Sequence, residues 1–231
     1  MKSRIVLFNP NTSSTVTADM VAIAKESAGE WADIHGHTAE FGAPIIVNAC
    51  DLETAGQAVD AFAERMLDAG WPADGIVIGA FGDPGLAAIR SQAPVPVVGF
   101  GEAAIAAAAA GGRAFSIVTT TPQLKSSIRQ QVEQFGVNEN LRSIRMTPGV
   151  PEEVMADADR LDRELVQLID KVMAEDGAKA VLVAGGPLSA SARRLRQRFA
   201  LPIIDPVTAS LKRLGQMLRQ AQREDMCDDI V

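Results

Sequence analysis

Short apolar runs alternate with longer stretches of helical periodicity along the whole chain. The apolar runs are nearly continuous, which is typical of parallel strands covered on both faces. They predict eight strands, at Ile5–Asn9, Asp33–Thr38, Gly75–Gly79, Val97–Gly99, Ala114–Thr119, Asn140–Met146, Ala180–Val183 and Ile203–Ile204. The stretches between them predict eight helices, at Ser14–Glu30, Thr54–Ala69, Leu86–Gln92, Gly101–Ala110, Pro122–Phe135, Asp157–Glu175, Ala190–Phe199 and Val207–Gln222. Alternation of this kind predicts an α/β fold built on parallel sheets.

The two halves of the chain repeat the same segments in the same order, about 105 to 111 residues apart. The matching pairs are Ile5–Thr12 with Ser116–Pro122, Gly75–Gly85 with Ala180–Ser189, and Val95–Gly99 with Leu201–Asp205. A duplicated α/β unit explains three matches in one order. We therefore expect two similar parallel-sheet lobes, one formed by residues 1–100 with 208–231 and the other by residues 101–207.

Charge and hydropathy limit the classes of partner that this chain is expected to bind. The net charge of −7, without a basic cluster, argues against a nucleic-acid partner. No apolar run reaches the roughly 18 to 20 residues that span a bilayer. The amino terminus enters a strand directly, without the long apolar stretch of a signal peptide. We expect a cytoplasmic protein that binds a small molecule and no membrane.

Cysteine and histidine are too sparse to organise a metal site or a disulfide framework. The cysteines, Cys50 and Cys227, are far apart in sequence. Cys50 is expected in the loop after the second strand, near the rim of a cleft. His35 and His37 are expected to be exposed residues of one strand, and a pair without further ligands holds metal poorly. The sequence therefore predicts no metal.

Two polar loops follow the first strands of the two halves, where ligands bind in parallel α/β sheets. The first is Asn9-Pro10-Asn11-Thr12-Ser13-Ser14, and its counterpart is Thr119-Thr120-Thr121-Pro122. Amide N–H groups at the start of the next helix could hold a carboxylate there. Helix capping by the hydroxyl residues explains both loops equally well. Both interpretations stay open at this point.

Two further loops follow the second matched strands. Ala80-Phe81-Gly82-Asp83-Pro84-Gly85 places an acid before a proline, which indicates either an N-cap or an acid–base group. Gly185-Gly186-Pro187-Leu188-Ser189 has two adjacent glycines, which indicate an oxyanion nest or a plain turn. Glu102 and Asp205 lie at helix starts, where a structural role is favoured over catalysis.

Several of these segments together resemble the aspartate/glutamate/hydantoin racemase superfamily, in particular hydantoin racemases. The resemblance rests on Asn9–Ser13, on the Phe-Gly-Asp-Pro-Gly block at 81–85 and on the Pro-Val-Val-Gly-x-x-Glu-Ala block at 96–103. It covers nearly the whole chain. The family implies two α/β lobes related by a pseudo-twofold axis, an active site between them, no cofactor and self-association into a homo-oligomer.

The family's catalytic residues are missing from this chain. In the family two cysteines, one on each loop, exchange a proton next to a carbonyl, and related decarboxylases keep one. The matching positions here are Ala80 and Gly185. The resemblance implies substrate-binding residues at Asn9, Asn11, Thr12, Ser13, Ala80, Phe81, Gly82, Thr119, Thr120, Thr121, Gly185, Gly186 and Pro187.

Three functions stay open for a chain without these thiols. The first is an isomerase or lyase acting on a small carboxylate or cyclic amide. In that case Asp83, Glu102 or the substrate's own group would move the protons. The second is a degenerate family member that binds small ligands without turnover. The third is a structural or regulatory role through oligomerisation.

Overall fold

A computed structural model describes the backbone of residues 2–228 and the side chains through Glu224. Its strands form two four-stranded sheets, each entirely parallel. The first has the order β2-β1-β3-β4 and the second β6-β5-β7-β8. The strands are β1 Ser3–Asn9, β2 Ala32–Thr38, β3 Gly75–Ile78, β4 Val97–Gly99, β5 Phe115–Thr119, β6 Leu141–Met146, β7 Ala180–Val183 and β8 Ile203–Ile204. The second sheet thus repeats the first strand by strand, which confirms the eight predicted strands and the two similar α/β lobes.

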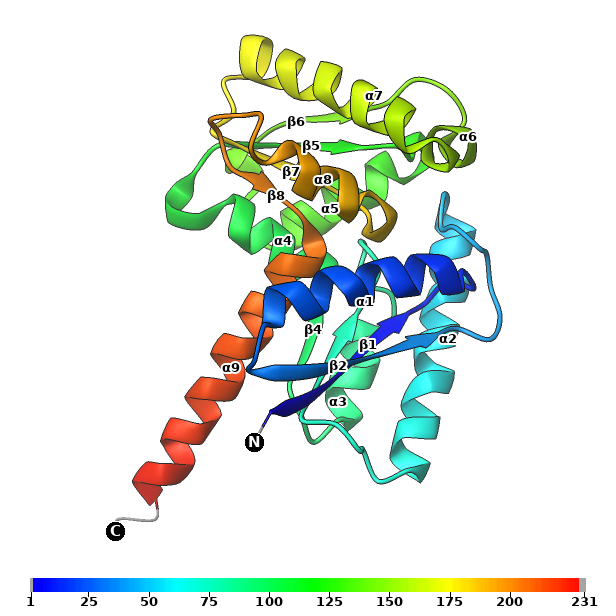
Figure 1. Cartoon of the computed structure of the whole chain (residues 1–231), viewed down its shortest axis with the longest axis vertical. Coiled ribbons are helices and arrows are strands. Elements are labelled where there is room, and N and C mark those ends of the chain that lie inside the picture. Colours follow the sequence, from blue (N-terminus) through cyan, green and yellow to red (C-terminus); the bar gives the residue numbers. More distant parts are fainter. Residues whose placement is uncertain (1, 229–231) are drawn as a thin grey trace.

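Helices cover both faces of each sheet (Figure 1). They are α1 Ser14–Ala28, α2 Ala49–Asp68, α3 Leu86–Gln92, α4 Phe100–Ala108, α5 Lys125–Gln134, α6 Pro151–Ala156, α7 Ala158–Lys171, α8 Ser189–Leu195 and α9 Pro206–Asp228. Short 3₁₀ turns lie at Ala110–Gly112, Pro122–Leu124, Asn138–Asn140 and Gly186–Leu188, and a π turn at Val172–Asp176. None of the helices in the described part of the chain is long and apolar enough to cross a membrane.

The sequence placed the start of α2 too late. This helix begins at Ala49, because the Asn48 side chain accepts a hydrogen bond from the Asp51 amide at 2.9 Å. Asp51 in turn accepts one from the Val47 amide at 3.0 Å, so the two side chains cap the helix start reciprocally. Cys50 therefore lies in the first turn of a helix, exposed, and not in a loop. The side chain of Cys227 lies outside the described residues.

The sequence also missed α6. This short helix starts at Pro151, a residue suited to a first helical turn, and buries Val154. It is separated from α7 by Asp157, whose carboxylate accepts from the Arg160 amide at 2.9 Å and so caps α7. Short helices of this kind have too few turns to show a clear periodicity.

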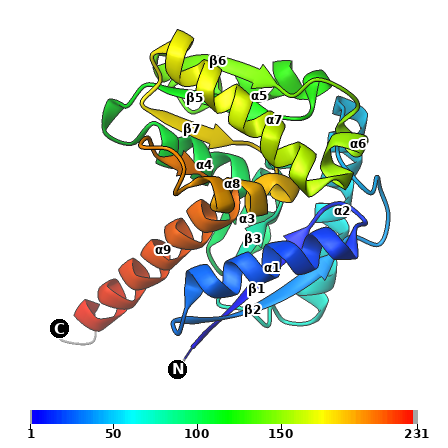
Figure 2. The ribbon, with the colours of Figure 1, turned by 45° about the horizontal axis from the view of Figure 1, so that its top comes forward.

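One hydrophobic core runs through both lobes. It contains Ile5 and Leu7 of the first sheet, Ile117 and Leu182 of the second, and buried residues of α4 and α9. Figure 2 shows α9 leaving the junction of the lobes and running along the first lobe. The first sheet ends at Gly99 and the second spans residues 115–204, so α4 connects the two. The lobe boundaries given above stay a prediction.

Candidate active site

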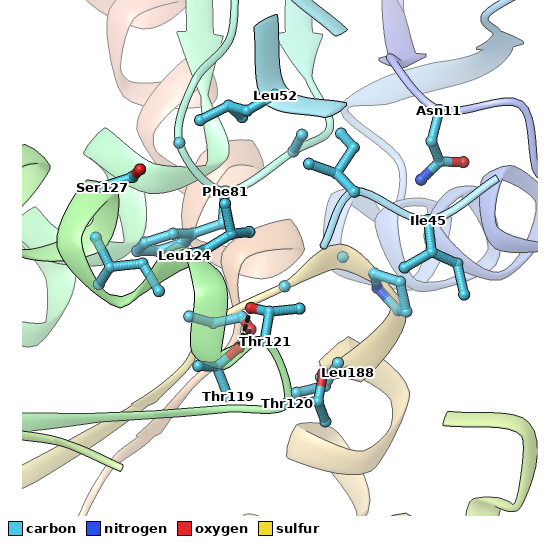
Figure 3. A pocket seen from close by; sticks show the side chains of 18 of the residues that line it. Asn11, Ile45, Leu52, Phe81, Thr119, Thr120, Thr121, Leu124, Ser127 and Leu188 are labelled. Atoms are coloured by element: carbon cyan, nitrogen blue, oxygen red, sulfur yellow. Dashed lines mark hydrogen bonds between the residues drawn. The ribbon is translucent and has the colours of Figure 1, made fainter. Parts of the chain in front are cut away.

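The carboxyl ends of the two sheets face a common cavity of about 660 Å³, its open mouth included. Its walls come from the loops after β1, β2 and β3 and the start of α2 in the first lobe, and from the loops after β5 and β7, α5 and α6 in the second. The lining residues are Asn11, Ile45, Ile46, Leu52, Gly79, Ala80, Phe81, Gly82, Thr119, Thr120, Thr121, Leu124, Ser127, Ile128, Met155, Ala184, Gly185, Gly186, Pro187 and Leu188. Figure 3 shows the threonines on one side of this space and Asn11 on another.

Ten of the residues that the resemblance singled out line this cavity. They are Asn11, Ala80, Phe81, Gly82, Thr119, Thr120, Thr121, Gly185, Gly186 and Pro187. The structure places Asn9, Thr12 and Ser13 outside the lining. It also places the two acids, Asp83 and Glu102, outside it. The five outside positions have local structural contacts instead.

Asn9 lies beneath the loop after β1 and stabilises it through hydrogen bonds. Its side chain is fully buried, and its amide nitrogen donates to Asn11 Oδ1 at 2.8 Å and to Thr17 Oγ1 at 3.0 Å. Ser13 caps α1 by accepting from the Val16 amide at 3.3 Å. The Thr12 amide donates to the carbonyl of Ala43 at 3.1 Å and so fixes the loop after β2.

Asn11 presents a hydrogen-bond donor to the cavity. Its Oδ1 accepts from Asn9 and, at 3.0 Å, from the Ser13 amide. These two bonds fix which end of the amide faces inward. Within the described residues its Nδ2 has no acceptor, and it points toward the interior of the cavity (Figure 3). This nitrogen can therefore donate to a carbonyl or carboxylate oxygen of a ligand.

The threonines offer hydroxyl groups of different character. Thr119 donates its proton to the Ala184 carbonyl at 2.9 Å and lies 3.3 Å from Thr121 Oγ1. Because Thr119 has one proton, Thr121 is the donor of that pair and keeps acceptor capacity for a ligand. Helix capping was one of the two open interpretations of this loop, and the Thr121 side chain makes no capping bond. Thr120 contacts the Met155 sulfur at 3.6 Å.

The loops after β3 and β7 contribute backbone amides. Within residues 2–228, the N–H groups of Ala80, Phe81, Gly185 and Gly186 have no protein acceptor. Gly185 has φ +130°, a conformation open almost only to glycine. Backbone N–H groups gathered in this way can bind an oxygen that carries negative charge.

No lining side chain within the described residues is ionisable. Ala80 and Gly185, the two positions that the sequence resemblance singled out, both line the cavity, and neither side chain has a proton to exchange. The lining contains one sulfur atom, in the Met155 thioether, which has no proton either. No group of three or more metal-ligating side chains occurs in the part of the chain that the structure describes. The site can hold a ligand through neutral groups, but it has no side chain suited to acid–base catalysis.

Asp83 caps a helix other than the one it precedes. Its backbone has φ +50°, and its carboxylate accepts from the amides of Gly101 and Glu102 at 2.7 Å each. It therefore caps α4, whereas the cap position of α3 is Gly85 with no side-chain bond. Burial raises the pKa of Asp83 to about 7, although the two amide bonds lower it. Glu102 accepts from the Gly99 amide at 3.1 Å and pairs with Arg90.

Sequence reasoning missed the apolar part of the lining. The missed side chains are Ile45, Ile46, Leu52, Leu124, Ile128, Met155 and Leu188, together with the hydroxyl of Ser127. The sequence contained one indication of these residues. Pro44-Ile45-Ile46-Val47 is an apolar run in a segment too short to form another strand or helix, so its side chains were candidates for a binding surface. The others lie on helices, where an apolar residue normally indicates core.

The histidines of β2 lie away from this cavity. His35 is half-buried and 2.9 Å from Asp33, and His37 has a more exposed surface, although its ring is still partly covered by neighbouring groups. Partial burial lowers the pKa of His37 below its usual value, and the charge of Arg65 lowers it further. Neither histidine supplies the proton exchange that the cavity lacks.

With this geometry in view, comparison with known proteins gives the family. Residues 5–214 match the model of the Asp/Glu/Hydantoin racemase family. The chain belongs to this family. It is 33% identical to a hydantoin racemase of Rhizobium meliloti over 217 residues, 93% of this chain and 88% of the relative. It is 31% identical to a hydantoin racemase of Paenarthrobacter aurescens, over 90% of this chain and 88% of that one.

Solved structures agree with this assignment. An allantoin racemase from Klebsiella pneumoniae superimposes with a TM-score of 0.88 at 30% identity, covering 95% of this chain and 89% of the other. An allantoin racemase from Pseudomonas fluorescens gives 0.86 at 26% identity, covering 94% and 92%. The chain is therefore a racemase-like enzyme of the isomerase type, with both lobes of the family present.

Proposed function

We propose that this protein is a cofactor-independent isomerase or lyase that acts on a small cyclic amide or carboxylate without two-thiol chemistry. The observation that carries the proposal is the cavity between two repeated sheets. It is lined by neutral hydrogen-bonding groups and apolar side chains, and alanine and glycine stand where the resemblance would place the family's thiols. Relatives that share about 30% identity with this chain over nearly its full length include hydantoin and allantoin racemases.

Of the two ligand classes, we favour the uncharged cyclic amide. A desolvated zwitterion or dicarboxylate requires opposite charges to compensate its lost hydration, and the lining side chains provide none. A cyclic amide requires donors for its carbonyls and acceptors for its N–H groups. Asn11 Nδ2 and the loop amides are such donors, and the Thr121 hydroxyl is such an acceptor.

Such a site can accelerate proton loss without a catalytic base. Removing the proton between a carbonyl and a ring nitrogen places negative charge on the carbonyl oxygen. N–H groups of Gly185 and Gly186 would stabilise that oxygen more in the transition state than in the ground state. The proton itself would then move to water or to another group of the substrate. We assign no proton transfer to Asp83 or Glu102, because neither lines the cavity.

The second candidate is binding without turnover. The absence of ionisable side chains among the described lining residues specifically favours it. A hydantoin, allantoin, an amino acid and a dicarboxylate should each be tested for binding by calorimetry and for α-hydrogen exchange in D₂O by NMR. We expect the cyclic amides to bind best and to exchange slowly. Binding without exchange would favour the second candidate, and no binding by any compound would refute both.

Cytoplasmic location and self-association are further parts of the proposal. The sequence pattern and the family resemblance support them. Light scattering of the purified chain tests self-association, and a monomer at micromolar concentration would contradict it.

A further inference from the structure

The end of the cavity opposite Asn11 is apolar. Figure 3 shows Leu52 and Leu124 there, on the far side of the space from Asn11, and Phe81 beside them. Ile128 of α5 adds a further aliphatic side chain to the lining. A bare ring that binds Asn11 and the loop amides leaves these side chains without a contact. Apolar surface of this kind suits a substituent on the ring.

Ser127 brings a hydroxyl to this apolar end. It lies on α5, one residue before Ile128, and it is half-buried. Among the described residues, no group forms a hydrogen bond with its Oγ, so this hydroxyl can donate to a ligand or accept from one. One polar group beyond an apolar wall is a common means of selecting a ligand, because it rewards a polar atom at one position only.

Ser127 also lies on the border between the cavity and a second, open groove. This groove has a volume of about 920 Å³, its open side included, and shares Leu52, Gly82 and Ser127 with the cavity. Leu52 packs on the backbone of Gly82, where a Cβ atom would lie 3.0 Å from Leu52 Cδ1. All three border residues are partly exposed. A substituent that extends past the apolar side chains therefore reaches the groove at Ser127.

The groove offers an uncharged ligand group better partners than a charged one. Its charged side chains already have partners, because Arg90 pairs with Glu102 and the Asp83 carboxylate accepts from Gln131 Nε2 at 2.8 Å. The exposed polar side chains that remain are the neutral amides of Gln130 and Gln134. A charged group would lose hydration here without a free counter-charge, whereas a carboxamide would exchange one hydrogen bond for another.

We propose that Ser127 is a specificity-determining residue, and that the substrate is a cyclic amide whose substituent has an apolar stem and an uncharged amide at its end. The stem lies against Leu52, Leu124 and Ile128, and the terminal amide binds the Ser127 hydroxyl at the border of the groove. The placement of the ring rests on the proposed function. The contacts of the substituent do not depend on turnover.

A series of hydantoins tests this assignment by calorimetry. The compounds carry a methyl, a butyl, a 3-carbamoylpropyl or a 3-carboxypropyl group at ring position 5. We expect affinity to rise about tenfold or more from methyl to butyl, because the stem buries apolar surface. The carbamoyl end should add about threefold or more. Equal affinities for methyl and butyl, or a carboxylate end that binds as tightly as the carbamoyl end, would overturn the inference.

Variants assign the two contributions to their residues. Ser127→Ala should reduce the affinity ratio of the carbamoyl to the butyl compound to about one, and Ser126→Ala, at an exposed neighbour, should keep the wild-type ratio. Leu52→Phe should narrow the border and reduce the ratio of the butyl to the methyl compound. Leu67→Phe, on the same helix and 56% exposed, is its control. A carbamoyl-to-butyl ratio that Ser127→Ala leaves as in the wild type would refute the role of Ser127.

α-Hydrogen exchange of the same compounds, followed by NMR in D₂O, separates this inference from the proposed function. Selective binding without exchange would support the inference and refute turnover. Exchange of all four compounds with equal affinity would support the proposed function and overturn the inference.

If no hydantoin binds, the proposed function fails, and pentanamide, which has the stem and the amide without the ring, still tests the apolar end. A shift of the Ser127 amide resonance with pentanamide, lost in Leu52→Phe, would support the inference. No shift in the wild type would overturn it.

Discussion

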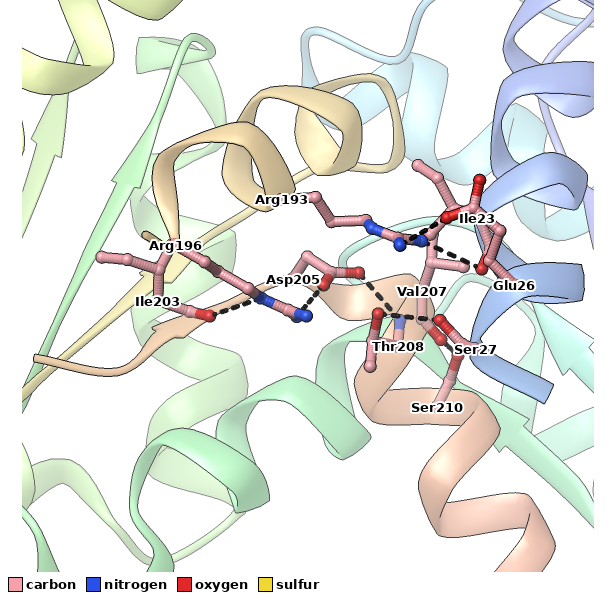
Figure 4. A network of polar contacts seen from close by, with 10 residues as sticks. All are labelled: Ile23, Glu26, Ser27, Arg193, Arg196, Ile203, Asp205, Val207, Thr208 and Ser210. Atoms are coloured by element: carbon pink, nitrogen blue, oxygen red, sulfur yellow. Dashed lines mark hydrogen bonds and ion pairs between the residues drawn. The ribbon is translucent and has the colours of Figure 1, made fainter. Parts of the chain in front are cut away.

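Arg196 and Asp205 form an ion pair where the chain passes from the second lobe back to the first (Figure 4). Asp205 is fully buried, and its other oxygen accepts from the Thr208 amide at 2.8 Å. This bond confirms its predicted role as the cap of α9. Nearby, Arg193 of α8 donates to the Ile23 carbonyl of α1 at 3.2 Å. The lobes are therefore joined by polar contacts at α8, α1 and α9, in addition to the shared core.

Replacing Asp205 should destabilise the protein strongly. Asp205→Ala removes the α9 cap and leaves Arg196 without its partner, and we expect a loss of about 2–4 kcal/mol in the free energy of unfolding. Asp205→Asn keeps a capping oxygen and should cost about half as much. Urea denaturation measures both. Asp162→Asn breaks a more exposed pair with Arg194 and should cost about 1 kcal/mol or less. Equal losses for Asp205→Ala and Asp162→Asn would contradict this account.

Replacing Gly185 by any residue with a side chain should destabilise the protein. Because its φ is +130°, Gly185→Ala should lose about 1–3 kcal/mol of stability through backbone strain. Gly177 has φ +66° with no atom near its Cβ position, so Gly177→Ala is the matched control, with a cost of about 1 kcal/mol. Thermal unfolding compares them. A well-tolerated Gly185→Ala would show that the loop adapts easily.

The backbone strain at Gly185 also affects a variant that carries thiols at positions 80 and 185. The double substitution Ala80→Cys with Gly185→Cys should fail to give a racemase, because the second loop must change conformation. Ala80→Cys alone should promote α-hydrogen exchange in one enantiomer of a bound hydantoin, since one thiol reaches one face. NMR in D₂O follows exchange, and polarimetry follows racemisation. Ala80→Ser has similar size and a far higher pKa, so exchange by this variant would contradict the thiol explanation.

Asn11 should determine ligand affinity through its amide nitrogen. Asn11→Asp keeps the oxygen that accepts from Asn9 and Ser13 but removes the donor, so the loop is preserved. We expect affinity for a cyclic amide to fall about tenfold or more. Thr12→Val, in the same loop but outside the lining, should leave affinity unchanged. Calorimetry distinguishes the two, and equal effects would indicate general damage to the loop.

Stability should depend on pH through Asp83. Its pKa of about 7 in the folded state exceeds the ordinary value of 3.8. Between these values the folded state retains a proton that the unfolded state has released, so stability falls as pH rises. Relative to Asp83→Asn, the wild type should lose about 2–4 kcal/mol between pH 4 and pH 8. Urea titrations across this range measure the difference. An increase with pH would show that Asp83 ionises readily inside the fold.

The sequence determined the elements and their duplication. Continuous apolar strands such as Val181–Val183 and the matched blocks after β3 and β7 are local patterns, and local patterns predict local structure. The resemblance carried by those blocks predicts the family's thiols at positions 80 and 185, where this chain has alanine and glycine. The loops that line the cavity were also predictable, because parallel strands present their carboxyl ends at one edge.

Only the tertiary structure decided which residues of those loops face the cavity and which ones support the loops. Asn9 and Asn11 are two residues apart, equally polar and both buried, yet only Asn11 lines the cavity, whereas Asn9 lies beneath the loop. Asp83 has the sequence signature of a cap for α3, but its positive φ directs it to α4 and Gln131. Such contacts join residues 18 to 48 positions apart. Spacing along the chain does not encode them, because they depend on how the packed lobes meet.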